Sequence, residues 1–298
     1  MPPTLAERLG FDPTDRVAIV HADDIGMCHA ANEGAFEALA NGPATCGSIM
    51  VPCPWFREAA DHAQAHPELD LGVHLTLNCE WDHYRWGPVA GRSAVPSLLD
   101  DQGFLPRTTL EVAQRARPEE VAIELRAQVE RALEAGVDVT HLDSHMGTCF
   151  FPQFVDVYGG LAREFDLPIF AAQPDLAALE KRGMGGLAKV LEPLLAQMRA
   201  DGVPVLDGFD AESLDFAHGE GESHNRARLA GLSSGIHYLI CHPARGGEEL
   251  DAVCPEHAHQ RDFERSFYGG DAGRKALEDQ GIRTLGMRAL RDLMRSRE

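Results

Sequence analysis

Residues 17–26 have the sequence VAIVHADDIG, in which an apolar run is followed by two adjacent aspartates and a glycine. The run Val17–Val20 predicts a strand that is buried on both faces of a parallel sheet. In α/β proteins, ligands bind at the carboxyl ends of such strands. Asp23 and Asp24 would repel each other there unless something shares their charge. We therefore expect either a divalent metal on one carboxylate, with the other free for proton transfer, or a polar turn that caps the next helix.

Segments typical of strands and helices alternate along the rest of the chain. Six more strands are predicted, at 46–51, 69–77, 137–145, 167–170, 203–207 and 235–243. Helices are predicted at 30–40, 55–65, 118–135, 152–165 and 176–201, and 271–296 predicts two helices around a short extended segment. The alternation favours an α/β fold with a mostly parallel sheet. Because no linker or internal repeat is visible, we expect residues 1–298 to form one domain.

Residues 78–110 interrupt this alternation and predict a long insertion or lid. The segment contains Trp81, Tyr84 and Trp86 together with several prolines and glycines. Loops of this length in compact domains usually carry a function. Its aromatic side chains could stack on a substrate, or they could pack the lid on itself.

The composition limits the partners and the compartment. The 298 residues include 27 basic and 47 acidic side chains, a net charge of -20, which argues against nucleic acid or an anionic membrane as a partner. No signal peptide or membrane span is predicted. Seven cysteines without a C-x-x-C pair are typical of reduced thiols in a cytoplasmic protein. The oligomeric state stays open, with a homodimer as one option.

Four of the predicted strands end in, or carry near their ends, polar residues that are unusual in a sheet. These residues are Asp23 and Asp24, then His74, then His141, Asp143 and His145, and finally His242. One histidine in an apolar strand is more often a hydrogen-bonded core residue than a ligand. The same feature on four strands instead favours a common site at one edge of the sheet.

The segment HLDSH at 141–145 can cluster imidazoles with a carboxylate. In a strand, alternate side chains share a face, so His141, Asp143 and His145 would point the same way. Imidazole and carboxylate ligands suit Zn²⁺ and related divalent ions, and three protein ligands leave a position for water. Asp143 could instead orient a ligand histidine. The spacing does not say which of the two histidines binds.

These residue types fit the hydrolysis of an amide or ester bond. A divalent metal lowers the pKa of water and polarises a carbonyl group. Asp23, beside the expected ligand Asp24, could take a proton from the water, and a protonated His242 could give one to the leaving group. Pro243 would help to hold the imidazole of His242 in place.

Several motifs resemble those of the YdjC-type carbohydrate deacetylases. HADDIG at 21–26 resembles the Asn-Ala-Asp-Asp-Phe-Gly opening of that family, and GVHL at 72–75, THLDSH at 140–145 and CHP at 241–243 resemble its later motifs. Asn32 and Gly34 also fit. The motifs occur in family order and span residues 17 to about 290. The chain departs from the family pattern at His21, and at 146–149, where MGTC replaces a histidine-rich run.

The resemblance implies a fold, a cofactor and an activity. The fold would be a deformed, seven-stranded (β/α) barrel related to the polysaccharide deacetylases. One divalent metal ion would be held by Asp24, His74 and His145, with Asp23 as the base and His242 as the acid. The reaction would remove an N-acetyl group from an amino sugar or a short oligosaccharide. The family is described with Mg²⁺, whereas two imidazoles favour Zn²⁺.

Two other functions are compatible with the same fold. A metal-dependent phosphoesterase is disfavoured because few lysines and arginines lie near the motifs. A non-catalytic sugar-binding protein is disfavoured because it would have no need of Asp23. Candidate substrate contacts are Trp81, Trp86 and Arg245, with a solvated surface position as the alternative for the arginine. We expect His218, His224, His257 and His259 on the surface.

Overall fold

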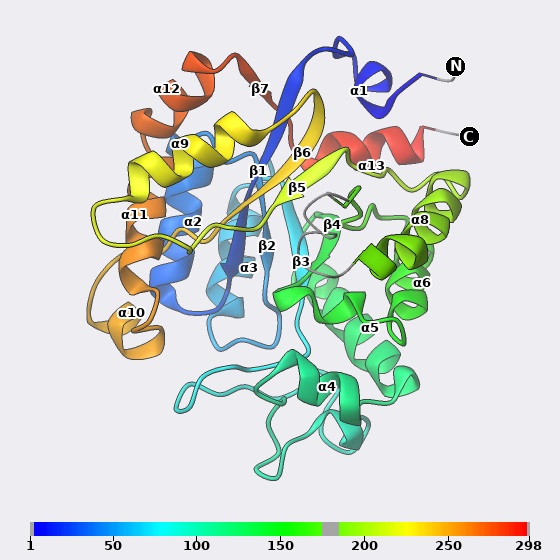
Figure 1. Cartoon of the computed structure of the whole chain (residues 1–298). Helices are drawn as coiled ribbons and strands as arrows, with labels where there is room; N and C mark the ends of the chain where they lie inside the picture. The colour runs from blue at the N-terminus through cyan, green and yellow to red at the C-terminus, as the bar shows by residue number, and fades with distance from the viewer. Residues whose placement is uncertain (1–2, 175–184, 297–298) are drawn as a thin grey trace.

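One parallel sheet, built around the segment 17–26, is the centre of the fold (Figure 1). The computed structural model describes residues 3–174 and 185–296. In this part of the chain seven strands pair in the order β4-β3-β2-β1-β6-β5, and β7 pairs with β1. The strands are β1 (Arg16–Ile25), β2 (Cys46–Ile49), β3 (Leu71–Leu75), β4 (Val139–Ser144), β5 (Gly208–Asp210), β6 (Gly235–Cys241) and β7 (Ile282–Thr284).

The strand β1 is buried along almost its whole length, as its apolar run predicts. Val17, Ala18, Ile19 and Val20 have no exposed surface. One edge of β1 pairs with β6 from residue 16 to 22, and the other edge pairs first with β7 and then with β2. Because β1 has neighbours on both edges, its carboxyl end delivers the two aspartates into the interior of the sheet.

Two predicted strands, 167–170 and 203–207, form only isolated bridges. Leu142 pairs with Ile169, and Ala172 pairs with Leu206. Backbone hydrogen bonds from Phe170 to Leu142 and from Leu206 to Ala171, both 2.8 Å long, connect the edge strand β4 to the chain that enters β5. Prolines at 168 and 204 cannot donate to a longer ladder. The segment 168–173 therefore curls the sheet into the expected deformed (β/α) barrel.

Helices cover the outside of the barrel. They are α1 (Leu5–Arg8), α2 (His29–Asn41), α3 (Phe56–Ala65), α4 (Thr109–Arg115), α5 (Pro118–Glu134), α6 (Val155–Phe165), α8 (Gly185–Ala200), α9 (Gly221–Gly231), α10 (Glu248–Val253), α11 (Ala258–Tyr268), α12 (Asp271–Asp279) and α13 (Met287–Arg295). On α5, Val121, Leu125 and Val129 recur every four residues and are buried, as one face of an amphipathic helix is, but Leu133 in the last turn is exposed. None of the described helices is long and apolar enough to cross a membrane.

The sequence prediction was incomplete in two other regions. The stretches around His218, His224 and His257, for which only a surface position was expected, contain or border α9, α10 and α11. Part of the predicted helix 176–201 lies outside the described residues. Figure 1 places the segment 78–110 beyond the carboxyl ends of β1 to β3, with both chain ends at the opposite side of the molecule. All seven cysteines are free and buried.

Gly42, at the end of α2, is required because of a close approach to another helix. Its φ of -103° is ordinary, but a Cβ built there would overlap the carbonyl oxygen of Tyr268 at the end of α11. We expect Gly42→Ala to lower the free energy of unfolding by about 1–3 kcal/mol, as overpacking does. Urea denaturation measures this. Gly160→Ala on α6, where a Cβ meets nothing within 4 Å, should cause no loss, and equal losses in both variants would contradict the explanation.

Candidate metal centre and active site

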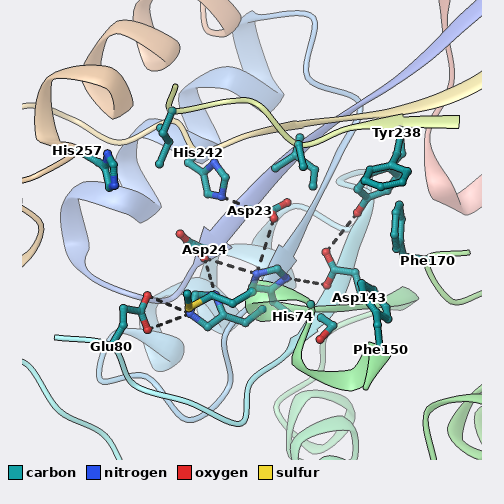
Figure 2. Close-up of a pocket in the computed structure, with 18 of the residues that line it drawn as sticks. Asp23, Asp24, His74, Glu80, Asp143, Phe150, Phe170, Tyr238, His242 and His257 are labelled. Atoms are coloured by element: carbon teal, nitrogen blue, oxygen red, sulfur yellow. Dashed lines mark hydrogen bonds and ion pairs between the residues drawn. The ribbon is translucent and has the colours of Figure 1, made fainter. Parts of the chain in front are cut away.

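A cavity of about 1190 Å³ lies among residues at and beyond the carboxyl ends of the strands (Figure 2). It is lined by the predicted residues Asp23, Asp24, His74, Asp143, His145 and His242. The barrel therefore brings together residues from β1, β3, β4 and the segment after β6. The strand-end argument located these side chains correctly, while the predicted residues His141, Trp86 and Arg245 do not line the cavity.

Asp24, His74 and His145 form a buried triad. The Oδ1 atom of Asp24 lies 3.3 Å from Nδ1 of His145 and 3.5 Å from Nε2 of His74. This buried oxygen has no hydrogen-bond partner. Leaving a buried carboxylate oxygen unpaired is costly, and one carboxylate with two imidazoles is a good ligand set for a divalent ion. The three ligand atoms lie within 4.8 Å of one another, so the triad fits a metal ion.

The other oxygen of Asp24 is held by an arginine that the sequence did not single out. Nη1 of Arg261, on α11, lies 2.8 Å from Oδ2 of Asp24. Burial would raise the pKa of Asp24, but Arg261 and the two imidazoles outweigh it and hold this pKa well below its usual range. Asp24 also has a φ of 63°, which is uncommon for a residue with a side chain and typical of functional sites. The carboxylate is thus charged, fixed at Oδ2 and free at Oδ1.

Asp143 orients His74 rather than joining the triad. Nδ1 of His74 lies 2.8 Å from Oδ1 of Asp143, whose Oδ2 accepts hydrogen bonds from Ser48 (2.9 Å) and Tyr238 (3.2 Å). Because Nδ1 donates a hydrogen bond to Asp143, Nε2, which faces Asp24, is the nitrogen that a metal ion would bind. This is the carboxylate–histidine arrangement that supports metal ligands in many proteins. Burial would lower the pKa of His74, but Asp143, Asp23 and Asp24 outweigh it and raise this pKa well above its usual range, so a metal ion would displace a proton from Nε2.

We expect Asp143→Asn to weaken metal binding by about 10–100-fold, the usual cost of losing such a supporting carboxylate. A competition titration against a chromophoric chelator measures the affinity. Asp82→Asn, which changes an exposed carboxylate on the same cavity, is the matched control and should leave the affinity unchanged. Wild-type affinity in the Asp143 variant would contradict this role.

His145 receives support from the segment 78–110. Its Nε2 atom lies 3.1 Å from both carboxylate oxygens of Glu80, while its Nδ1 atom faces Asp24. Burial would lower the pKa of His145, but Glu80 and Asp24 outweigh it and raise this pKa to about 9. A metal ion that binds at Nδ1 must displace any proton there, so binding couples to proton release.

Asp23 lies between His21 and the imidazoles of the cavity. Its Oδ1 atom lies 2.6 Å from Nδ1 of His21, and its Oδ2 atom lies 3.8 Å from Nε2 of His74 and 3.8 Å from Nε2 of His242. His21 thus fixes one oxygen of Asp23, and the other is directed toward the cavity and its imidazoles.

His141 lies in a buried layer behind Asp23, which corrects its prediction as an alternative ligand. Its Nε2 atom lies 2.8 Å from Nε2 of His21, and its Nδ1 atom lies 2.9 Å from the hydroxyl of Thr140. Burial and the neighbouring His21 lower the pKa of His141 to about 3. His21, His141 and Cys46 lie close enough together to hold a metal by distance alone. The two imidazoles of this buried group, however, already hydrogen-bond to each other.

His242 is neutral in this arrangement, whereas the sequence analysis expected it to be protonated. The hydroxyl of Ser213 donates to Glu264 (2.7 Å), so it accepts a hydrogen bond from Nδ1 of His242 (2.8 Å). The Nε2 atom keeps its lone pair, and burial lowers the pKa of His242 to about 4. No motif indicated Ser213 or Glu264.

The remaining predicted contacts divide into two groups. Trp81 lines the cavity, as does His257, which was expected to be on the surface. Trp86 is only 3% exposed, and its ring nitrogen donates to the carbonyl of Asn78 within the segment 78–110. Arg245 pairs with Glu33 and Glu37 on α2, outside the cavity. Local partners hold both side chains away from the cavity, so the structure agrees with the alternatives, in which Trp86 packs within the segment 78–110 and Arg245 lies at the solvated surface.

The fold and the site define a class of protein: a deformed (β/α) barrel with a buried carboxylate–imidazole cluster at its strand ends. The chain belongs to the YdjC-like family, whose model, described as "YdjC-like protein", matches residues 17–279. A carbohydrate deacetylase of Thermus thermophilus is 36% identical over 244 residues, covering 80% of this chain and 81% of that protein. A carbohydrate deacetylase of Thermoanaerobacter pseudethanolicus is 26% identical over 249 residues, covering 84% and 89%.

A solved structure shares this fold. It is the crystal structure of an Enterococcus faecalis protein whose suggested role is cellobiose-phosphate cleavage, with a TM-score of 0.74 and 24% identity. The match covers 93% of this chain and 99% of that chain. The predicted fold class is confirmed.

Proposed function

We propose that this chain is a metal-dependent hydrolase that removes an N-acetyl group from an amino sugar or a short oligosaccharide. The observation that carries the proposal is the unpaired Oδ1 atom of Asp24, which faces His74 and His145 beside a second carboxylate, Asp23. Membership of the YdjC-like family, with relatives named carbohydrate deacetylase, supports the same chemistry.

Asp24, His74 and His145 would hold one divalent ion. When bound, such an ion polarises the acetyl carbonyl and favours ionisation of a water molecule. Two imidazoles with one carboxylate favour Zn²⁺ or a similar transition metal over Mg²⁺, which prefers oxygen ligands. Arg261 keeps Asp24 charged and leaves its Oδ1 atom available.

Asp23 would act as the general base. His21 holds its Oδ1 atom, so Oδ2 is the atom that takes a proton from the attacking water. His242 would act later in the reaction. Because its Nε2 atom is unprotonated and lies 3.8 Å from Oδ2 of Asp23, it can receive that proton and pass it to the leaving nitrogen. Ser213 and Glu264 would keep the imidazole in the required tautomer.

The two alternative functions have less support. Among the described residues that line the cavity, the only arginines are Arg107 and Arg261, and each is paired with an aspartate. A phosphate-bearing substrate would call for an unpaired cationic group. A sugar-binding protein without catalysis would leave the buried placement of Asp23 between His21 and the cavity without a purpose.

Acetate release tests the proposal. The metal-loaded protein should release acetate from N-acetylated glucosamine saccharides of one to four rings. Treatment with a chelator should abolish the release, and either Zn²⁺ or Mg²⁺ should restore it, which would identify the effective metal. Absence of acetate release with both ions and all four saccharides would overturn the proposed activity. Full activity after complete metal removal would overturn the metal dependence alone.

A further inference from the structure

The cavity has two chemically different walls. On one side of the triad, the segments 80–84 and 254–261 contribute Glu80, Asp82 and His257, which can bond to sugar hydroxyls. On the other side, the described lining residues between 146 and 240 include no charged, amide or imidazole side chain. Figure 2 shows Glu80 and His257 on one side of Asp24 and His74, with Phe150, Phe170 and Tyr238 on the other.

The apolar wall exposes large side chains that a folded protein normally buries. Met146 is 56% exposed, Phe150 is 40% exposed and Phe209 is 47% exposed. They are three of the seven large apolar side chains that are exposed in the described residues, and all three line this cavity. Exposed apolar side chains scattered singly need no explanation, but a cluster in a cavity indicates a binding surface.

The rings of this wall form a continuous row that ends at the active site. The ring centroids of Phe209 and Phe170 are 5.5 Å apart, and those of Phe170 and Phe150 are 5.6 Å apart. The ring centroid of Phe170 also lies 4.8 Å from that of Tyr238. The hydroxyl of Tyr238 donates to Asp143, the carboxylate that orients His74. An apolar group that extends from the active site along this row would therefore contact a ring at every step as far as Phe209.

The backbone holds this wall in place. Phe209 lies on β5, Phe170 lies in the segment that closes the barrel, and Phe150 lies in the turn after His145. In that turn Met146 has a φ of 50°, a conformation that costs energy for a residue with a side chain. The wall is thus part of the barrel and of the segment that carries a candidate ligand.

A second sugar ring is a poor occupant for this wall. Its hydroxyl groups would lose water and find no side-chain partner that is free, since the hydroxyls of Tyr158 and Tyr238 are already bonded within the barrel. An alkyl or aryl group would bury apolar surface against the rings without this cost.

We propose that the substrate is an amino sugar that carries an apolar aglycone, and that the row Phe150–Phe170–Phe209 binds this aglycone while the polar wall binds the sugar. This inference rests on the proposed deacetylase function and adds the substrate class. The cavity volume of about 1190 Å³, above the range of about 300–1,000 Å³ for sites of drug-sized ligands, accommodates such a conjugate.

The test compares three compounds with the metal-loaded wild-type protein. They are the methyl and octyl β-glycosides of N-acetylglucosamine, both used below the micelle concentration, and the methyl glycoside of N-octanoylglucosamine. We expect the octyl glycoside to have a KM at least 10-fold lower than that of the methyl glycoside, with a similar kcat. Each methylene group buried on the wall should contribute roughly fourfold.

Substitutions at the end of the row then test the assigned surface. Phe209→Gln should bring the ratio of the KM of the methyl glycoside to that of the octyl glycoside close to one. Phe209→Leu, which keeps an apolar side chain, should keep most of the preference for the octyl glycoside. Ile123→Ala removes an apolar side chain that is 42% exposed on α5 outside the cavity, and it should keep the full ratio. A ratio that is unchanged in Phe209→Gln would overturn the assignment to this wall.

The outcomes distinguish this inference from the proposed function. Acetate release with equal KM values for the two glycosides overturns the apolar aglycone and leaves the deacetylase function standing. A preference for the N-octanoyl compound instead would assign the wall to the acyl group and overturn the inference as stated. If neither acetate from the two glycosides nor octanoate from the N-octanoyl compound is released, the proposed function fails. Calorimetric titration with both glycosides, run in parallel, then tests whether the apolar wall binds the aglycone. Equal dissociation constants would overturn this assignment, and a lower dissociation constant for the octyl glycoside would support it.

Discussion

Asp23→Asn is expected to lower kcat for acetate release by a factor of about 10² to 10⁴, the usual contribution of a general base. Asparagine has nearly the shape of aspartate, and its Oδ1 atom can still accept a hydrogen bond from His21. The amide nitrogen that replaces Oδ2 cannot take a proton from water. The binding site for the metal should survive, because the triad uses Asp24, His74 and His145.

Two measurements on the same preparation check this prediction. Elemental analysis should give wild-type metal content, and acetate release should fall through kcat with KM little changed. Asp61→Asn removes a carboxylate of α3 that lies outside the cavity, is 54% exposed and pairs with Arg57. It should keep near wild-type activity. A wild-type rate in Asp23→Asn would remove Asp23 as the base.

His145→Ala is expected to abolish stoichiometric metal binding and, with it, acetate release. The substitution removes one of three ligand atoms and leaves Glu80, which is partly exposed and can be hydrated. Asp24→Ala should have the same effect on the metal, but it also leaves Arg261 buried without its partner, which is strongly destabilising. The histidine variant therefore separates loss of the ligand from loss of the fold.

Thermal unfolding gives a second readout for the metal. A metal ion present at 100 times its dissociation constant stabilises the folded wild-type protein by about 2.7 kcal/mol, whereas the His145 variant should gain nothing. His257→Ala, which removes another imidazole from the same cavity, should keep both the metal and the thermal shift. Full metal content in His145→Ala would show that the triad is assigned wrongly.

The sequence could predict which residues meet because the signal is local. An apolar run that ends in Asp23 and Asp24, and strands that end near His74 and His145, place these side chains at the same edge of a parallel sheet. The helix period of α5 and the strand runs follow from the same local patterns. For this reason the fold class predicted from the sequence agrees with the structure.

The sequence could not decide whether His141 or His145 binds the metal, because the two side chains lie at different depths in the barrel. Alternation puts the two side chains on one face, but a strand rises about 3.3 Å per residue, so four residues separate them by roughly 13 Å. His145 consequently reaches the cavity, whereas His141 lies in the layer below with His21.

The partners of the site residues were also beyond the reach of the sequence. Arg261 comes from α11 and Glu80 from the segment 78–110, and neither belongs to a motif around the triad. Charged residues in such segments are usually solvated, so composition favours the surface for both. Only packing of α11 against the strand ends turns Arg261 inward, where burial makes pairing with Asp24 necessary.

By itself, the sequence determined the alternation of strands and helices, the parallel barrel and the motif side chains at its open end. These depend on periodicities of two and about 3.6 residues, which each segment carries alone. The tertiary structure decided which oxygen of Asp24 stays unpaired, which nitrogen of each histidine faces the cavity, and where the apolar wall lies. Those properties depend on contacts between segments distant in the chain, and such contacts exist only after the barrel has closed.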